Sequence, residues 1–249
     1  MVMQRRGFGQ HYTLWMGVCL ALAAAFASES VRAEPQPSPT PVQWELTLTF
    51  APPQRIDVPG VSRGGRSYWY LLLHVVNDTG EDRDFMPVID RVEEMESELP
   101  ESLVGRVSAD APQIKVTPAL LGVDPAVYQA IKRRHARTHP FLIPPVEAIT
   151  RLRQGRDYAI DTVAIFPDLD PRTSRFTVYV GGLSGERQRL PNPSFVEPEA
   201  GKPAPKDADK NPRWFVIQKT LAIPFRMPGD VRTRRAVEPQ LDRIHWVMR

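Results

Sequence analysis

The chain has 249 residues, of which 42% are hydrophobic and 24% charged, values typical of a globular protein rather than a disordered, collagen-like or coiled-coil one. Its 32 Lys and Arg barely exceed its 29 Asp and Glu. Such a balanced charge is not that of a nucleic-acid-binding protein, so we expect no nucleic-acid partner. The 26 Pro and 15 Gly disfavour long helices and favour short strands joined by turns.

Residues 1–33 have the pattern of a signal peptide. The arginine pair at 5–6 precedes an uninterrupted apolar run at 14–26, which small residues follow. This run is too short to cross a hydrocarbon core about 30 Å thick as a helix, and no later segment approaches the roughly 20 apolar residues that a span requires. We therefore expect a soluble mature protein, periplasmic or extracellular, cleaved after Ala33 or alternatively after Ala27. Sec and twin-arginine export both remain open.

The chain's single cysteine, Cys19, lies inside this leader. The mature protein therefore has no thiol to form a disulfide, to bind zinc or an iron–sulfur cluster, to attach c-type haem or to act as a nucleophile. We do not expect a lipid-modified N-terminus, because Cys19 lies in the middle of the apolar run rather than at its end.

The sequence after the leader divides into a tether and one folded domain. Residues 34–41 alternate proline with polar residues, which is typical of a polyproline II tether. Residues 42–249 show no internal repeat and are expected to form a single β-sandwich domain. Within it, residues 191–212 are rich in proline and polar side chains and predict a long solvated loop.

Strand patterns alternate with turns along this domain. Residues 42–50 alternate apolar and polar side chains, which predicts a half-buried strand. Residues 68–76 are apolar on both faces except at His74, which suits a central strand between two layers. Residues 158–166 and 175–180 are separated by a short turn and predict a β-hairpin.

One helix and one further strand complete the pattern. Asp124 and Pro125 have the N-cap and first-turn pattern of a helix, which ends before Pro140. Residues 214–225 have strand character, and Pro224 marks an edge or a bulge there. We therefore expect a mainly β chain, a single immunoglobulin-like antiparallel β-sandwich with one short helical insertion.

Four segments resemble those of an uncharacterised group of secreted bacterial proteins of the planctomycete type: YWYLLLHVVNDTG (68–80), GRDYAIDTVAIFPDLDP (155–171), FTVYVGGLSGE (176–186) and QKTLAIPFRMPGD (218–230). The resemblance extends over most of the chain from Trp44 onward. It implies an exported immunoglobulin-like sandwich in which a strand ends in an Asn-x-Thr-Gly turn. It implies no activity and carries over no catalytic residue.

Two pairs of residues are candidates for metal binding. His135 and His139 have the spacing that places two rings on one helix face, although the basic residues around them oppose a cation and favour a solvated helix end. Asp168 and Asp170, with other loop carboxylates, are candidate oxygen ligands for calcium, and an ordinary Pro-Asp turn is the competing interpretation. No other cofactor is expected.

No catalytic motif is found, so we do not expect an enzyme. The segment 181–186 (GGLSGE) lacks the nucleophile-elbow pattern and is better explained by a turn, and His74 is expected to be a hydrogen-bonded core residue. The acidic run at 93–98 is expected to be a solvated face, and binding of a basic partner is the alternative. A serine, a histidine and a carboxylate brought together from distant strands would still make a hydrolase. A sugar-stacking platform is also open, although most of its candidates should be core: Trp44, Tyr68, Trp69, Tyr70 and Trp214.

We therefore expect an exported, non-enzymatic β-sandwich that mediates protein contacts or has a structural role in the cell envelope. An envelope protein or a polysaccharide is the expected partner. The alternative is a carbohydrate- or calcium-binding extracytoplasmic module, which would use Asp168 and Asp170 or a strip of surface aromatic side chains. The oligomeric state is left open.

Overall fold

The computed structural model describes residues 34–59, 66–96, 113–122, 125–197 and 212–249. The chain divides into two units, Met1–Pro35 and Gln36–Arg249, and the helices and strands described below belong to the second. The predicted signal peptide and residues 198–211 of the predicted solvated loop lie outside the described residues. Within the described ranges, no helix is long and apolar enough to cross a bilayer.

A small antiparallel sheet is built around one long strand, β3. Its four strands are β1 (Thr47–Phe50), β2 (Gln54–Val58), β3 (Arg66–Val76) and β8 (Ile160–Pro167). β1 and β2 pair in succession with one edge of β3, and β8 pairs with the other edge. Pro52 and Pro53 separate β1 from β2, because proline has no backbone N–H to donate to a ladder.

A larger antiparallel sheet is organised in the same way around β11, with the order β10-β11-β9-β5-β6. Its strands are β5 (Val88–Met95), β6 (Gln113–Pro118), β9 (Thr173–Gly181), β10 (Arg187–Pro191), β11 (Trp214–Arg226), β12 (Gln240–Leu241) and β13 (His245–Met248). β10 pairs with the first residues of β11 and β9 with its last residues, whereas β12 and β13 pair with the opposite edge. A separate pair is formed by β4 (Arg83–Phe85) and β7 (Thr150–Leu152).

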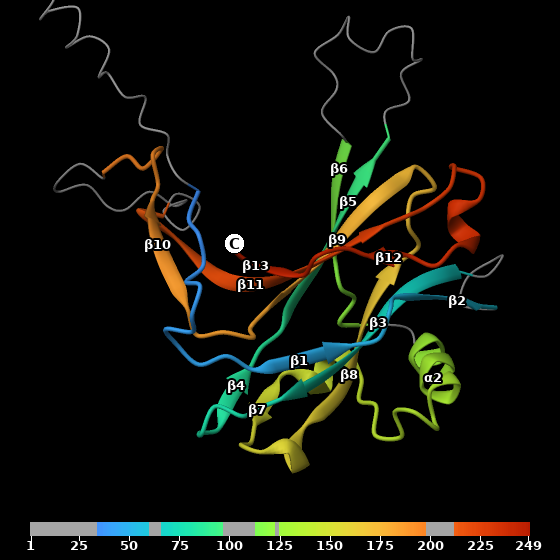
Figure 1. Ribbon diagram of the computed structural model, residues 1–249, viewed down its shortest axis with the longest axis horizontal. Coiled ribbons are helices and arrows are strands. Elements are labelled where there is room, and N and C mark those ends of the chain that lie inside the picture. Colours follow the sequence, from blue (N-terminus) through green and yellow to red (C-terminus); the bar gives the residue numbers. More distant parts are fainter. Residues whose placement is uncertain (1–33, 60–65, 97–112, 123–124, 198–211) are drawn as a thin grey trace, which may run out of the picture. The chain divides into compact units, whose positions relative to one another are not determined.

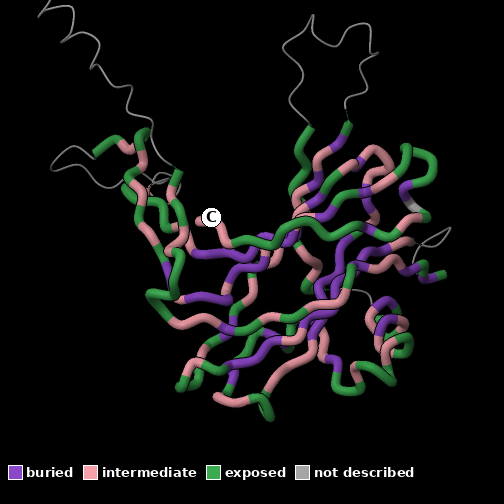
Figure 2. The backbone as a smooth tube through the Cα atoms, in the orientation of Figure 1, coloured by how far each residue is buried: buried purple, intermediate pink, exposed green. Residues whose placement is uncertain are grey.

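Both faces of β3 are buried, each in a different apolar core (Figures 1 and 2). One face packs with the large sheet: Trp69, Leu71, Leu73 and Val75 of β3 share a core with Phe176, Val178, Val180, Leu221, Ile223 and Phe225. The other face is covered by helix α2 (Pro125–Arg134), whose buried Val127 and Ile131 pack in a core with Tyr68, Tyr70 and Leu72. The apolar pattern on both faces of this strand predicts this central position, and the structure confirms it.

The predicted β-hairpin of residues 158–166 and 175–180 is wrong. β8 pairs with β3 in the small sheet, whereas β9 pairs with β5 and β11 in the large sheet. The segment between them, which holds Asp168 and Asp170, therefore crosses from one sheet to the other. Two apolar strands joined by a short turn have the same sequence pattern whether they pair together or face each other across a core.

The prediction of a mainly β chain with antiparallel sheets and one α-helix is confirmed for the residues that the structure describes. The two sheets face each other over a shared core, as in a β-sandwich. The immunoglobulin-like part of the expectation stays a prediction.

The packing of α2 is tested by Ile131→Ala. Because Ile131 is 0% exposed, we expect the free energy of unfolding to fall by about 2–5 kcal/mol, measured by urea denaturation. Gln129→Ala, on the exposed side of the same helix, is the control and should change it by no more than about 0.5 kcal/mol. Equal effects of the two substitutions would contradict the second core.

Candidate functional site

The predicted calcium ligands lie in the crossing between the sheets, where arginine side chains bind them. Asp168 accepts hydrogen bonds from Trp69 Nε1 (3.0 Å) and Arg55 Nε (3.4 Å). Arg172 donates from Nε and Nη2 to the two carboxylate oxygens of Asp170, each at 3.1 Å. These Arg172 hydrogen bonds lower the pKa of Asp170. The two carboxylates are thus engaged separately, each by protein donors.

A buried ion pair lies beneath this crossing. Arg91 and Glu93 are 1% and 0% exposed, and Arg91 Nη2 donates to Glu93 Oε1 at 2.7 Å. The second oxygen of Glu93 accepts hydrogen bonds from Asp170 N (3.2 Å) and Thr173 Oγ1 (3.0 Å). Burial lowers the pKa of Arg91, and the Glu93 carboxylate opposes that shift. The expectation that residues 93–98 form a solvated face is therefore wrong for Glu93, which anchors the crossing.

The two predicted histidine ligands lie side by side at the end of α2. The ring centroids of His135 and His139 are 5.9 Å apart, although α2 ends at Arg134 and the two rings do not share a helix face. His135 Nε2 lies 2.8 Å from the Tyr70 hydroxyl, and His139 Nδ1 lies 3.0 Å from Thr138 Oγ1. Burial, and then the neighbouring His139, lower the pKa of His135. His135 thus connects the helix end to β3.

The structure brings no complete metal site together from these candidates. Among the described residues, no group of three or more His, Cys, Asp or Glu side chains is arranged to hold a metal ion. The calcium site at Asp168 and Asp170 and the metal site at His135 and His139 stay predictions.

A histidine and a carboxylate do meet on the small sheet. His74 Nδ1 lies 2.7 Å from Asp161 Oδ1, and the His74 side chain is 43% exposed, so it is hydrogen-bonded as expected but not a core residue. The serine of the glycine-rich segment is not part of this pair. Ser184 is buried elsewhere and accepts a hydrogen bond from Glu186 N at 3.1 Å.

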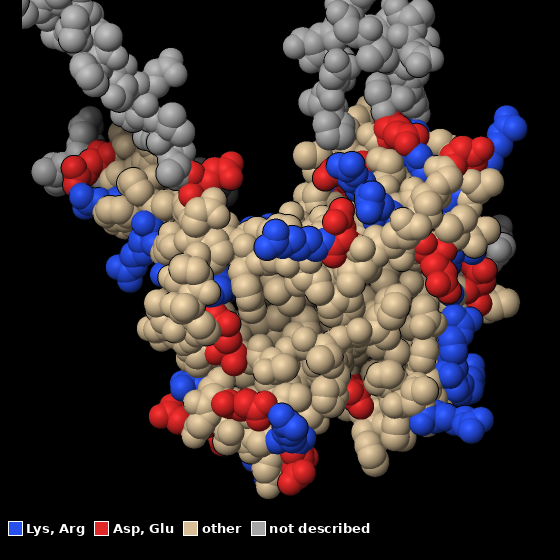
Figure 3. Space-filling view, viewed as in Figure 1, with Lys and Arg blue, Asp and Glu red and all other residues tan. Residues whose placement is uncertain are grey.

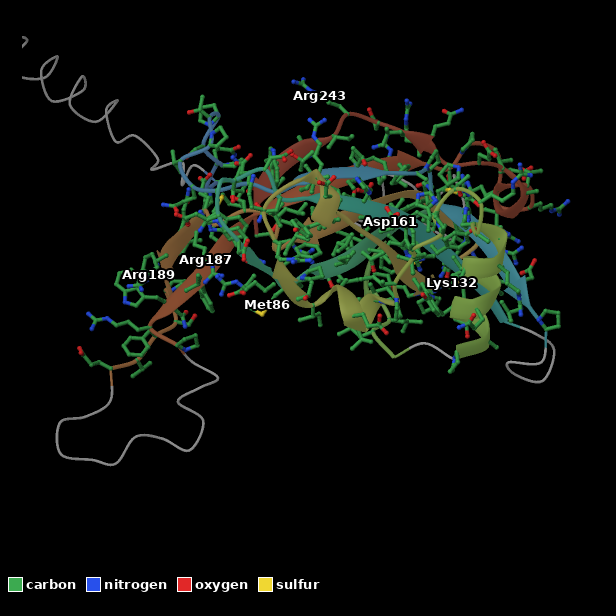
Figure 4. All side chains as sticks on the ribbon, turned by 90° about the horizontal axis from the view of Figure 1, so that it is seen from below. Met86, Lys132, Asp161, Arg187, Arg189 and Arg243 are labelled. Carbon is green, nitrogen blue, oxygen red and sulfur yellow. The ribbon has the colours of Figure 1, made fainter. Side chains whose placement is uncertain are left out.

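A further candidate site is a groove at the base of the arm that β10 makes with the first residues of β11. The groove has a volume of about 560 Å³, and its lining includes Trp44, Arg83, Asp84, Met86, Val88, Arg187 and Gln218. Figure 4 shows Met86 and Arg187 toward the same side of the domain. Val88 also lines an adjoining cavity of about 180 Å³, whose other walls include Pro87, Pro118, Leu121, Pro145 and Ala148. We call the two together the Val88 groove.

Two glycines allow the groove to form. Gly182 has φ +86°, and a Cβ atom there would lie 2.5 Å from the Met86 carbonyl oxygen. A Cβ atom on Gly185 would lie 2.5 Å from Trp44 Nε1. Only glycine therefore lets these segments approach so closely. The segment 181–186 does turn the chain, but it leads from β9 to β10 along one edge of β11.

A buried lysine stabilises the groove from beneath. Lys219 is 2% exposed, and its Nζ lies 2.7 Å from Glu45 Oε1 and 3.4 Å from Glu186 Oε2. It also donates to the Ser38 carbonyl oxygen at 3.0 Å, while Ser38 N and Oγ each donate to Glu186 Oε1 at 2.9 Å. Ser38, in the predicted tether, is thus held on the domain. Because Trp44 precedes Glu45, this cluster also holds Trp44 in the groove wall.

Glu186 and Lys219 stabilise each other's charged form in this cluster. Burial alone would raise the pKa of Glu186, but the hydrogen bonds from Ser38 and the Lys219 ammonium outweigh it, so the pKa is lowered. Burial alone would lower the pKa of Lys219, but Glu45 and Glu186 outweigh it, so the pKa is raised. The sequence did not reveal this cluster, because its members are far apart in the chain.

The predicted aromatic strip is mostly core. Tyr68, Trp69 and Tyr70 are buried, as expected for β3, whereas Trp214 is 47% exposed on the arm. Trp44 is half-buried, and the Arg83 guanidinium lies 5.5 Å from its ring centroid. The groove therefore has one aromatic wall rather than an open stacking platform.

The close approach at Gly182 is tested by Gly182→Ala against Gly80→Ala. Both glycines have positive φ, +86° and +91°, but nothing lies within 4 Å of a Cβ atom at Gly80. We expect Gly80→Ala to cost about 1–2 kcal/mol through backbone strain alone. Gly182→Ala should cost distinctly more, since its methyl group meets the Met86 carbonyl. Equal losses of stability in thermal unfolding would show that the contact is unimportant.

The ion cluster predicts a pH-dependent loss of stability. Because the pKa of Glu186 is lowered from its usual 4.5, its contribution is complete above that value and disappears as the pH falls through the lower folded-state value. We expect Glu186→Gln to be less stable than the native protein at neutral pH and this difference to shrink as the pH is lowered further and further below 4.5. Denaturant titrations at neutral pH and at a series of acidic pH values measure it. A difference that does not change with pH would contradict the cluster.

Comparison with known proteins finds no match: no family model matches the sequence, and no curated protein and no solved structure matches it. The resemblance to secreted proteins of the planctomycete type stays a prediction. What this protein binds has to follow from its own surfaces.

Proposed function

We propose that the protein is an exported, non-catalytic β-sandwich that binds another protein through the Val88 groove. The observation that carries this proposal is that an apolar cavity and a larger groove with charged lining residues share one exposed side chain, Val88. Such a site takes an apolar anchor side chain in the cavity and the polar chain around it in the groove.

The walls of the cavity favour a protein over a sugar. They are made mostly of proline, valine, alanine and leucine side chains, which offer few hydrogen-bonding partners to sugar hydroxyls. Met86 and Val88 are 62% and 57% exposed beside it. Burying these two side chains against a partner's apolar residue would be favourable, at about 25 cal/mol per Å² of apolar surface.

The polar part of the groove has the composition of a protein interface. Tryptophan, methionine and arginine are enriched at such interfaces, and here Trp44, Met86, Arg83 and Arg187 line one groove. Asp84 and Arg187 have no ion pair within the described part of the chain, so both charges are available to a partner. Their opposite signs favour a partner segment that carries both charges beside its apolar anchor.

Export and an envelope location are part of this proposal. They are supported by the leader-like pattern of residues 1–33. An envelope protein is therefore the proposed partner.

The groove is tested with a phage-displayed library of random peptides. We expect enriched peptides to share one apolar side chain and to bind the Val88→Asp variant at least about tenfold more weakly, since a carboxylate at the cavity mouth is costly to bury. Val116→Asp is the matched control, because Val116 is also a strand valine of the large sheet and is 54% exposed, against 57% for Val88. Failure to enrich any peptide, or equal losses in both variants, would contradict the proposal.

A further inference from the structure

A second groove, of about 390 Å³, lies on the outer face of the large sheet. Its charged lining residues are Arg175, Arg226, Arg243, Glu94 and Asp242, and His245 lies with them. Figure 4 shows Arg243 on the side of the domain opposite Met86, Arg187 and Arg189. This groove, which we call the arginine groove, is therefore separate from the Val88 groove.

The strand register places like charges next to each other in this groove. Arg175 of β9 lies directly opposite Arg226 of β11 and opposite Glu94 of β5. Arg226 Nε lies 3.5 Å from Asp242 Oδ2, whereas Arg175 has no carboxylate within ion-pair distance in the described residues. Like charges directly opposite on neighbouring strands are destabilising. A bound anion would remove this repulsion.

Pro224 accounts for the position of the third arginine of the groove, Arg243. Its carbonyl oxygen accepts a hydrogen bond from Asp242 N at 2.9 Å, so its nitrogen, which has no hydrogen to donate, faces the same edge of β11. The ladder is interrupted at this point: Phe225 pairs with Leu241 and Ala222 with His245. The three residues 242–244 thus oppose only two of β11, and this bulge places Arg243 beside the groove, in line with the sequence expectation for Pro224.

We propose that the arginine groove binds the carboxylate groups of an acidic, uronic-acid-containing polysaccharide. Guanidinium groups match carboxylates in charge and in planar hydrogen-bonding geometry. Glu94 and Asp242 would repel a simple polyanion, but they accept hydrogen bonds from sugar hydroxyls. A ligand with both carboxylates and hydroxyls therefore fits this lining better than a phosphate polymer does.

The surroundings of the groove also favour a polymer. Its residues come from β5, β9, β11 and the β12–β13 bulge, so the groove extends across the sheet instead of closing around a small molecule. Figure 3 views this side of the domain and shows basic and acidic side chains next to one another at its surface. This site is independent of the protein-binding proposal, since the two grooves share no lining residue.

The test is binding of the purified protein to polygalacturonate, with neutral dextran and inorganic polyphosphate as comparison probes. We expect binding to polygalacturonate that weakens with salt, no binding to dextran, and weaker binding to polyphosphate. The double variant Arg175→Gln/Arg243→Gln should bind polygalacturonate at least about tenfold more weakly.

The matched control is Arg133→Gln/Arg189→Gln, which removes the same charge from two exposed residues that line neither groove. It should bind polygalacturonate like the native protein. Equal weakening by both double variants would show a general effect of net charge and overturn the proposal. Tighter binding to polyphosphate than to polygalacturonate, or no binding to polygalacturonate, would overturn it as well. Circular dichroism of both variants confirms that a loss does not come from unfolding.

Discussion

The burial of both faces of β3 is the constraint on which the rest of the structure depends. A strand that is apolar on both sides is stable only with a layer on each side. The large sheet supplies one layer and α2 the other, and β8 shares this position, with Phe166 in the first core and Ile165 in the second. The outer face of the large sheet and the β10–β11 arm have no such cover among the described elements, and the two grooves lie there.

The sequence predicts which faces of a strand are buried better than it predicts strand partners. Apolar periodicity is local, so the double burial of residues 68–76 and the helix after Pro125 are visible without a structure. Strand pairing depends on contacts far apart in the chain, and this is why β8 and β9 have the pattern of a hairpin while they belong to different sheets. The segment around Asp168 and Asp170 has the composition of a loop whether it closes a hairpin or crosses between the two sheets.

The sequence does not predict the burial of charged side chains for a related reason. Glu93 and Lys219 have the sequence environment of solvated residues, and burying either alone would be strongly unfavourable. Glu93 is paired with Arg91 two residues away, but it also accepts hydrogen bonds from the distant residues Asp170 and Thr173. Lys219 is paired with two carboxylates that are distant in the sequence, Glu45 and Glu186. The glycines of residues 181–186 could have indicated the Val88 groove. Repeated glycine occurs where another segment packs closely against the backbone, as well as in turns.

The two proposed sites share the rigid strands that position them. Gln218 of β11 lines the Val88 groove and Arg226 of the same strand lines the arginine groove. Arg175 lies near the start of β9, and Gly182 directly follows its end. Because no lining residue is common to both, the proposed polysaccharide and protein ligands would not compete for the same side chains. A protein held on an envelope polysaccharide meets a partner held there at a raised local concentration, so weak affinity at each site is sufficient for a stable complex. On this argument, neither groove needs to enclose its ligand, and both are open at the surface.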